Sequence, residues 1–255
     1  EALGREIDQE EERLRNVIRG IRNVLHRFGY LHRGYPTEKA DMLADVFDND
    51  GLILCELVDR GVLDHLPPED LAEVFSWFSF DREFRYGNRF VLPDRLVLAR
   101  RRIEDVEHAV LGEERSEGLS ISEGHNPNFY GAARAWCRGS SMAEISDKIE
   151  LSEGDLVMTF NKTIDLLRQV GEMLQQVNPE HPLRGRLRQA FGQQPGRQQV
   201  GGKAGLAPFR GQRQPVLQLP GVVDQHIDRR RATGQAAHQA LDLRLQRTVA
   251  DLGLQ

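Results

Sequence analysis

The sequence is poor in the residues and segments that define several common protein classes. It has two cysteines in 255 residues, so it carries no disulfide framework and no cysteine cluster of the kind that binds a metal. No run of about 18 apolar residues is present, so we expect no transmembrane helix and no membrane partner. The first residues, EALGREIDQEEERLR, are charged throughout and do not resemble a signal peptide.

The two cysteines, Cys55 and Cys137, each lie in an apolar helical pattern. We interpret them as buried, reduced thiols of a cytoplasmic protein. The sequence also begins without a methionine. We therefore expect a piece of a longer protein, although processing or the choice of boundaries would leave the same start.

Familiar catalytic motifs are missing as well. The sequence contains no G-x-x-x-x-G-K-[ST], H-E-x-x-H, C-x-x-C or G-x-S-x-G. The eight histidines are scattered, and none has a second ligand at a spacing typical of metal sites. Acidic pairs such as Glu69 and Asp70 fall in the first turns of predicted helices, where the helix dipole favours them. We expect no catalytic residue, no metal and no cofactor in this chain.

Charge is spread unevenly along the chain. Residues 1–190 hold 25 basic and 35 acidic side chains, whereas residues 191–255 hold 9 and 4. After Ala190 there is no glutamate, one lysine (Lys203) and twelve glutamines among Gly, Arg and Pro. This composition predicts a low-order, disordered tail over 191–255. Three origins are open: an Arg/Gln-rich RNA-binding segment, an unrelated segment, or an out-of-frame translation.

Apolar periodicity predicts a mainly α protein. The expected helices are 8–28, 38–47, 51–60, 66–81, a long helix that begins at Pro93, and 153–170. The stretch 124–139 should form another helix, with Asn126 as its N-cap and Pro127 at its first position. A short helix should follow the capping box that begins at Ser141. YLHRGYPT, at 30–37, predicts a short β wing. We divide the chain into a junction helix and wing (1–47), a helical bundle (48–190) and the tail (191–255).

The stretch EGDLVMTFNKTIDLLRQV, 153–170, predicts an amphipathic helix whose second side is chemically mixed. Its core side comprises Val157, Phe160, Ile164 and Leu167, with Leu174 beyond. Its other side comprises Met158, Asn161, Lys162, Asp165, Arg168 and Gln169. Because Asp165 can pair with Lys162 or Arg168 at helical spacing, solvent alone could cover this side. The run Arg100–Arg102 has the same ambiguity: it is either a nucleic-acid patch or a solvated face compensated by Glu104, Asp105 and Glu107.

Two long segments together resemble a known family. IRNVLHRFGYL…TEKADMLADV…NDGLILCELVDRGVLDHLPPEDLAEVFSWFSFD resembles the junction into the C-terminal helical domain, called DSHCT, of superkiller-type DExH-box RNA helicases. HNPNFYGAARAWCRGSSMAEISDKIELSEGDLVMTFNKTIDLLRQV resembles the tryptophan helix, the turn and the E-G-D-h-V-R helix of that domain. The resemblance covers residues of about 15–190.

The resemblance implies a function for the parent protein and for this part of it. Family members are ATP-driven RNA helicases that bind ATP and Mg²⁺ between two RecA-like domains, which this chain does not contain. The DSHCT helices pack on that core and close the channel through which single-stranded RNA leaves. The implied role is therefore an accessory domain of RNA processing or decay, with RNA and the RecA-like core as partners.

Four residues are predicted to bind nucleic acid, and the resemblance matches three of them to family positions. Glu56 matches the glutamate of L-L-x-T-E, and Asn161 and Lys162 occupy the two basic positions of the last helix, on the same side as Arg168. Trp136 and Gly154-Asp155 match structural positions. The family's arginine after D-h-V is Met158 here and the first basic residue is Asn161, which leaves fewer cations for phosphates. The family's turn phenylalanine is Met142.

One different class of function remains open from the residues alone. A freestanding helical bundle with a winged start would bind protein or duplex DNA without catalysis, and a degenerate gene product would do neither. A helicase fragment should have Walker A and DExH sequence encoded upstream of Glu1, whereas a freestanding protein should have a start codon nearby.

Overall fold

The computed structural model describes residues 2–81 and 87–192. Contacts divide the chain into two units, Glu1–Leu206 and Ala207–Gln255, and the described residues all belong to the first. The predicted low-order tail, beyond residues 191 and 192, lies outside the described residues. The division at residue 47 stays a prediction.

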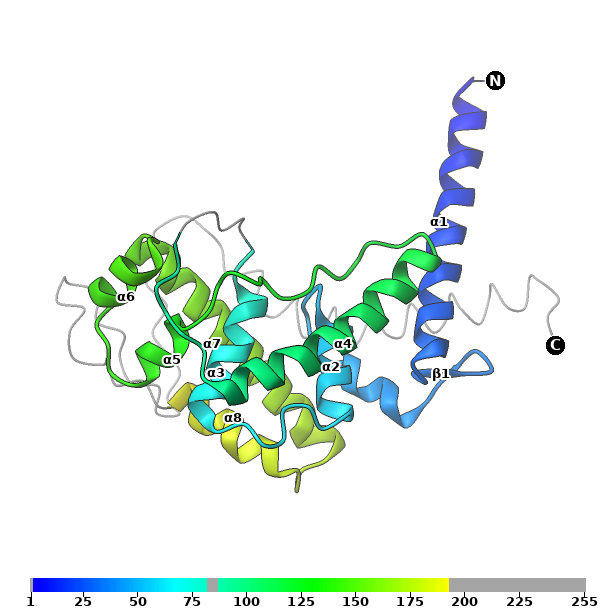
Figure 1. Ribbon diagram of the computed structural model, residues 1–255. Helices are drawn as coiled ribbons and strands as arrows, with labels where there is room; N and C mark the ends of the chain where they lie inside the picture. Colours follow the sequence, from blue (N-terminus) through cyan, green and yellow to red (C-terminus); the bar gives the residue numbers. More distant parts are fainter. Residues whose placement is uncertain (1, 82–86, 193–255) are drawn as a thin grey trace, which may run out of the picture. The chain divides into compact units, whose positions relative to one another are not determined.

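Helices dominate the described part of the chain, as predicted (Figure 1). In chain order the elements are α1 Ala2–Arg27, β1 Leu31–His32, β2 Tyr35–Pro36, a 3₁₀ helix η1 Glu38–Leu43, α2 Gly51–Asp59, α3 Pro68–Ser79, α4 Asp94–Ser116, α5 Ala132–Cys137, α6 Met142–Ile149, α7 Glu153–Val177 and α8 Pro182–Gly192. The mainly α fold with a leading helix and a short β wing is confirmed. The predicted helix over 38–47 is the shorter η1.

The wing is a two-stranded antiparallel hairpin with a two-residue turn. Leu31 pairs with Pro36 and His32 with Tyr35. Arg33 and Gly34, between the strands, have φ angles of 51° and 85°. Two consecutive positive φ angles define the tight hairpin turn whose twist matches that of the strands, which is why a glycine is needed here.

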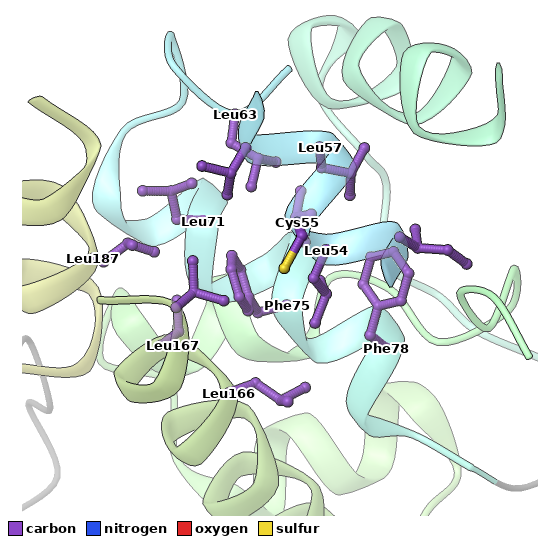
Figure 2. Packing of buried hydrophobic residues seen from close by; sticks show 14 of the residues in the cluster. Leu54, Cys55, Leu57, Leu63, Leu71, Phe75, Phe78, Leu166, Leu167 and Leu187 are labelled. Atoms are coloured by element: carbon purple, nitrogen blue, oxygen red, sulfur yellow. The ribbon is translucent and has the colours of Figure 1, made fainter. Parts of the chain in front are cut away.

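Helix α3 is the centre of the larger core. Ten of its twelve residues are buried, and it packs against α5, α7 and α8. Figure 2 shows the packing: Leu71, Phe75 and Phe78 of α3 lie among Leu54 and Cys55 of α2 and other aliphatic side chains. The remaining labelled members are Leu57, Leu63, Leu166, Leu167 and Leu187. Burial of this apolar surface is the main stabilising contribution to the bundle.

A second, smaller core joins α5, α6 and the start of α7. Its aromatic rings stack in pairs: Phe80 on Phe129 with centroids 4.7 Å apart, and Trp136 on Phe160 at 4.6 Å. Trp136, matched to a structural position by the family resemblance, therefore has a packing role. Met142 packs against the same cluster.

Local capping fixes the starts of α6 and α7. Ser141 and Glu144 form the predicted capping box, with both reciprocal hydrogen bonds present. The Ser152 hydroxyl accepts a hydrogen bond from the amide of Asp155 at 3.1 Å and so caps α7. These caps confirm two helix starts predicted from the sequence.

The start of α5 differs from the prediction. Residues 126–130 are not helical, and α5 begins after Gly131, which has a φ of 86°. Asn126 accepts hydrogen bonds from the amides two and three residues later (3.0 and 3.2 Å) and thus caps a turn. Glu73 of α3 accepts from the amides of Gly131 and Arg134, the latter at 2.9 Å. A carboxylate 58 residues away in sequence therefore caps α5 instead of Asn126.

The buried side of α7 is also rotated relative to the prediction. Three predicted core positions are buried: Phe160, Leu167 and Leu174. Val157 is 40% exposed and Ile164 is half-buried, whereas Thr159 and Thr163 lie in the core. Each threonine hydroxyl donates to the backbone carbonyl four residues earlier at 2.8 Å. Because the hydroxyls are satisfied within the helix, these residues enter the core without an unpaired polar atom.

Residues 119–126 form a connecting segment from α4 toward α5 that has no regular structure. Three buried acidic side chains hold its backbone. Glu114 accepts from the amides of residues 121 and 122 (3.2 and 3.0 Å), Asp50 from those of 123 and 124 (2.9 and 2.7 Å), and Glu107 from that of His125 (2.7 Å). Burial raises the pKa of Asp50, although the hydrogen bonds from the amides of residues 123 and 124 partly oppose that shift.

Candidate nucleic-acid interface on helix α7

The mixed side of α7 is only partly open to solvent. Met158 is 66% exposed, Asn161 and Arg168 are exposed, and Lys162 and Asp165 are half-buried. We call this side, from Met158 to Gln169 together with the residues that lie against it, the α7 surface. It brings three of the four predicted RNA-binding residues, Asn161, Lys162 and Arg168, together along about two helical turns.

The segment between η1 and α2 lies against this surface. The Lys162 ammonium lies 3.7 Å from the carboxylate of Asp48, and the side-chain oxygen of Gln169 accepts a hydrogen bond from the amide of Phe47 at 2.7 Å. Asp48 in turn accepts the amide of Asp50 at 3.0 Å, just before α2. Residues 47 and 48 thus lie against α7 at two points separated by seven residues of helix.

The cations of the α7 surface are already engaged by carboxylates. Arg168 forms an ion pair with Asp165, which also accepts from the Gln169 amide group at 2.7 Å. With Asp48 beside Lys162, two acidic groups face two basic ones. The surface therefore offers hydrogen-bonding groups and local charge, but it is not a basic patch.

Glu56, the fourth predicted RNA-binding residue, lies apart from the α7 surface. Its side chain is 2% exposed, with Lys39 Nζ at 2.6 Å and an Arg60 nitrogen at 2.8 Å. Lys39 also donates to Asp59 at 2.7 Å. Burial alone would lower the pKa of Lys39, but the hydrogen bonds to Asp59 and Glu56 outweigh it and raise that pKa. These contacts give Glu56 a structural task, holding η1 to α2, and its contact with RNA stays a prediction.

The cysteines differ in burial. Cys55 is fully buried and its thiol donates to the Met42 carbonyl at 3.3 Å, whereas Cys137 is half-buried. Burial raises the pKa of Cys55 to about 12 and that of Cys137 to about 11. Both are free thiols, but only Cys55 is as buried as predicted.

Arg100, in the ambiguous basic run of α4, contacts its own helix. It pairs with Glu104 at 3.1 Å and lies over the Trp77 ring at 6.0 Å. Arg101 and Arg102 are exposed. The compensated interpretation therefore holds for Arg100, and the choice between the two interpretations stays open for the two arginines after it.

Phe47 is a feature of the α7 surface that sequence reasoning missed. It is 76% exposed although the residue before it, Val46, is buried. The sequence signal was available: a single aromatic in the polar run DVFDND, outside any apolar period. Its place beside Gln169 depends on a contact across 122 residues, which local pattern does not reveal.

In residues 2–81 and 87–192, no group of three or more histidine, cysteine or acidic side chains is arranged to hold a metal ion. None of the helices described in this part of the chain is both long and apolar enough to cross a membrane.

Comparison with known proteins decides the family. The model of the DSHCT (NUC185) domain matches residues 33–193, well over half of the chain. The chain belongs to the DSHCT family. The family assignment made from the sequence motifs is therefore confirmed.

Two relatives of this DSHCT protein are helicases of Schizosaccharomyces pombe. One is the ATP-dependent RNA helicase mtr4, 25% identical over 155 residues, which cover 58% of this chain and 14% of the helicase. The other is a helicase described as uncharacterized, also 25% identical over 155 residues, covering 58% and 15%. The chain thus spans about a seventh of the length of the curated relatives it matches.

Proposed function

We propose that the chain is the C-terminal accessory domain of an ATP-dependent superkiller-type RNA helicase and that its α7 surface guides single-stranded RNA at the exit of the helicase core. Family membership and the RNA helicase among its relatives support the general role. The observation that carries the RNA contact is that Asn161, Lys162 and Arg168 share the side of α7 that the core leaves accessible.

In this proposal the domain works by position and not by catalysis. Lys162 and Arg168 contact phosphate oxygens, and the Asn161 amide reaches a ribose or a base edge. ATP and Mg²⁺ are bound by RecA-like domains outside this chain, where ATP hydrolysis supplies the movement of the strand. The rigid packing of α7 on α3 and α8 lets the surface hold its shape while the strand slides past. A cytoplasmic location belongs to the same proposal.

The charge of the chain sets the expected strength of the grip. Residues 1–190 carry 25 basic and 35 acidic side chains, so long-range attraction of RNA is weak. Both cations of the α7 surface must also exchange a carboxylate partner for phosphate. We therefore expect weak binding by this chain alone and a shallow salt dependence, equivalent to about one or two phosphate contacts.

The apolar side of α1 supports a contact with the helicase core. Near the C-terminal end of α1 this apolar side is buried, as at Val24, but nearer the N-terminus Leu14 and Ile18 are 58% and 49% exposed. The exposed part continues the same side of the helix by more than two turns. In the proposal, a RecA-like core domain of the parent protein covers it.

Charge reversal at Lys162 tests the RNA contact. Binding of a fluorescent 12-nucleotide single-stranded RNA would be measured by anisotropy for the 255-residue chain at low salt. Lys162→Glu should weaken binding by roughly five- to tenfold, because an attraction to phosphate becomes a repulsion. Helix content by circular dichroism should not change, and Lys162→Gln should give an intermediate loss.

Arg15→Glu is the matched control. It makes the same charge reversal on an exposed residue of α1 that also has a carboxylate partner, Glu11 at 3.0 Å, and binding should stay within about twofold of the native value. Equal RNA binding by native protein and Lys162→Glu, or a larger loss in Arg15→Glu, would remove α7 as the contact. Preference for duplex DNA would favour the freestanding-module alternative.

A further inference from the structure

Phe47 combines high exposure with a fixed backbone. Its side chain is 76% exposed, yet its amide donates to Gln169 of α7 at 2.7 Å and the next residue, Asp48, accepts the amide of Asp50 at 3.0 Å. Val46, on its other side, is 6% exposed and anchored in the core. The ring is therefore presented to solvent from a held position and not from a free loop tip.

Exposure of one aromatic side chain has no functional meaning by itself, since isolated apolar residues are normal on protein surfaces. Tyr35, at the wing, is equally exposed at 76%. What distinguishes Phe47 is its neighbourhood. The residue after it lies 3.7 Å from Lys162, and the Gln169 that holds it follows the exposed Arg168 directly in α7.

An aromatic face beside cations is the combination that single-stranded nucleic-acid surfaces use. Cationic groups follow the phosphates, and bases stack on the ring, because every base has a π face. Stacking does not require the ring to be charged or hydrogen-bonded, so it suits a surface whose two cations are partly neutralised by Asp48 and Asp165.

We propose that Phe47 is a base-stacking residue: a base of the single strand that lies along α7 stacks on its ring. This inference rests on the proposed function, because it needs RNA on the α7 surface. It adds what the charged residues do not supply, a binding contribution that is independent of salt and open to every base. Purines, with their larger rings, should bind more tightly than pyrimidines.

Three substitutions of Phe47 separate stacking from bulk. Phe47→Ala removes the ring, Phe47→Leu keeps an apolar side chain without a π face, and Phe47→Trp enlarges the face. Binding of 12-nucleotide oligo(A) and oligo(U) RNA by the 255-residue chain would be measured at two salt concentrations. Phe47→Ala and Phe47→Leu should lower the affinity for oligo(A) at least about fivefold at both salt concentrations. Phe47→Trp should bind oligo(A) as tightly as the native protein or more tightly.

The tryptophan variant also gives a direct readout. The native tryptophans lie in packed environments, Trp77 being 1% exposed and Trp136 stacked on Phe160. An indole at position 47 should be quenched when a base stacks on it, in addition to any change in the native protein. Tyr35→Ala is the control, since it removes an equally exposed ring from the wing, and it should bind RNA as the native protein does.

The outcomes distinguish this inference from the function on which it rests. If Lys162→Glu weakens binding but Phe47→Ala does not, the α7 surface binds RNA without stacking and the inference is wrong. An equal loss in Tyr35→Ala, or no added quenching in Phe47→Trp, would also overturn it. If the native chain binds no single-stranded RNA, both proposals fail. Thermal unfolding of each variant by circular dichroism verifies that the compared proteins are folded.

Discussion

Lys162 Nζ lies 3.7 Å from the carboxylate of Asp48, which precedes it by 114 positions in the sequence. The only lysine of the α7 sequence is thus shared between the protein's own carboxylate and any phosphate that reaches this surface. An acidic neighbour lowers the affinity of a cation for an external anion, because the anion must displace it or be repelled by it.

Asp48→Asn should therefore strengthen RNA binding. The amide keeps an oxygen that can accept the amide of Asp50, as Asp48 does at 3.0 Å, but it no longer neutralises Lys162. We expect a gain of about two- to fivefold in affinity and a steeper dependence on salt, measured by anisotropy titration. Asp41→Asn, an exposed change in η1, is the control; an equal gain there would indicate a general effect of net charge.

Glu73 should be among the residues most important for stability. It is fully buried and accepts from the Trp77 indole and the Arg134 amide, both at 2.9 Å, and from the Gly131 amide. Glu73→Ala leaves three donors without this partner, two of them buried and the Arg134 amide partly buried, at about 1–3 kcal/mol for each buried donor before relaxation. We expect a loss of at least about 3 kcal/mol in urea unfolding.

Glu69→Ala provides the comparison within α3. Its side chain is 27% exposed and lies 3.8 Å from both Arg95 and Arg138, so its removal should cost less than about 1 kcal/mol. Similar losses for the two variants would mean that Glu73 does not cap α5. The stability loss of Glu73→Gln should fall between these two. The side-chain amide of glutamine keeps one accepting oxygen, but its NH2 group would face other donors.

Alanine substitutions at Gly131 and Gly139 should distinguish the cost of backbone strain from the cost of steric overlap. Their φ angles are 86° and 93°, so alanine is strained at both. A Cβ at Gly131 would lie 2.2 Å from Cβ of Phe90, whereas a Cβ at Gly139 would have no atom within 4 Å. Gly139→Ala should cost about 1 kcal/mol, and Gly131→Ala clearly more, in the same urea assay. Equal costs would contradict the close approach of Phe90.

The thiols should react slowly at neutral pH. Burial raises the pKa of Cys137 to about 11 and of Cys55 to about 12, and only the thiolate attacks. At pH 8 the thiolate fraction of Cys137 is on the order of one in a thousand, and it rises tenfold per pH unit until the pKa is reached. Ellman's reagent should label Cys137 before Cys55, with both labelled rapidly in urea. Fast native labelling at pH 8 would contradict the raised pKa values.

Elements with local signals were predictable from the sequence. The Ser141–Glu144 capping box and the Arg33-Gly34 turn each lie within four residues, and the structure has both. The family resemblance rested on motifs in sequence order and did not depend on side-chain placement. Three of the predicted site residues, at helical spacing on α7, share one side for the same local reason.

Several features that the sequence could not reveal depend on contacts between residues far apart in the sequence. The start of α5 is set by Glu73, and no rule of local capping refers to a side chain in another helix. The predicted core side of α7 was wrong by part of a turn. Thr159 and Thr163 can be buried because their hydroxyls donate to carbonyls of the same helix, and a pattern of polar and apolar residues does not show this. The position of the Phe47 backbone beside α7 needs the contact with Gln169.

The connecting segment 119–126 has an implication for engineering the domain. Loops usually accept inserted residues and affinity tags, but here successive backbone amides are matched to Glu114, Asp50 and Glu107 in turn. One added residue would shift every later amide away from its carboxylate and leave buried charges without donors. The wing turn at Arg33-Gly34, next to the exposed Tyr35, is the better place to attach a label.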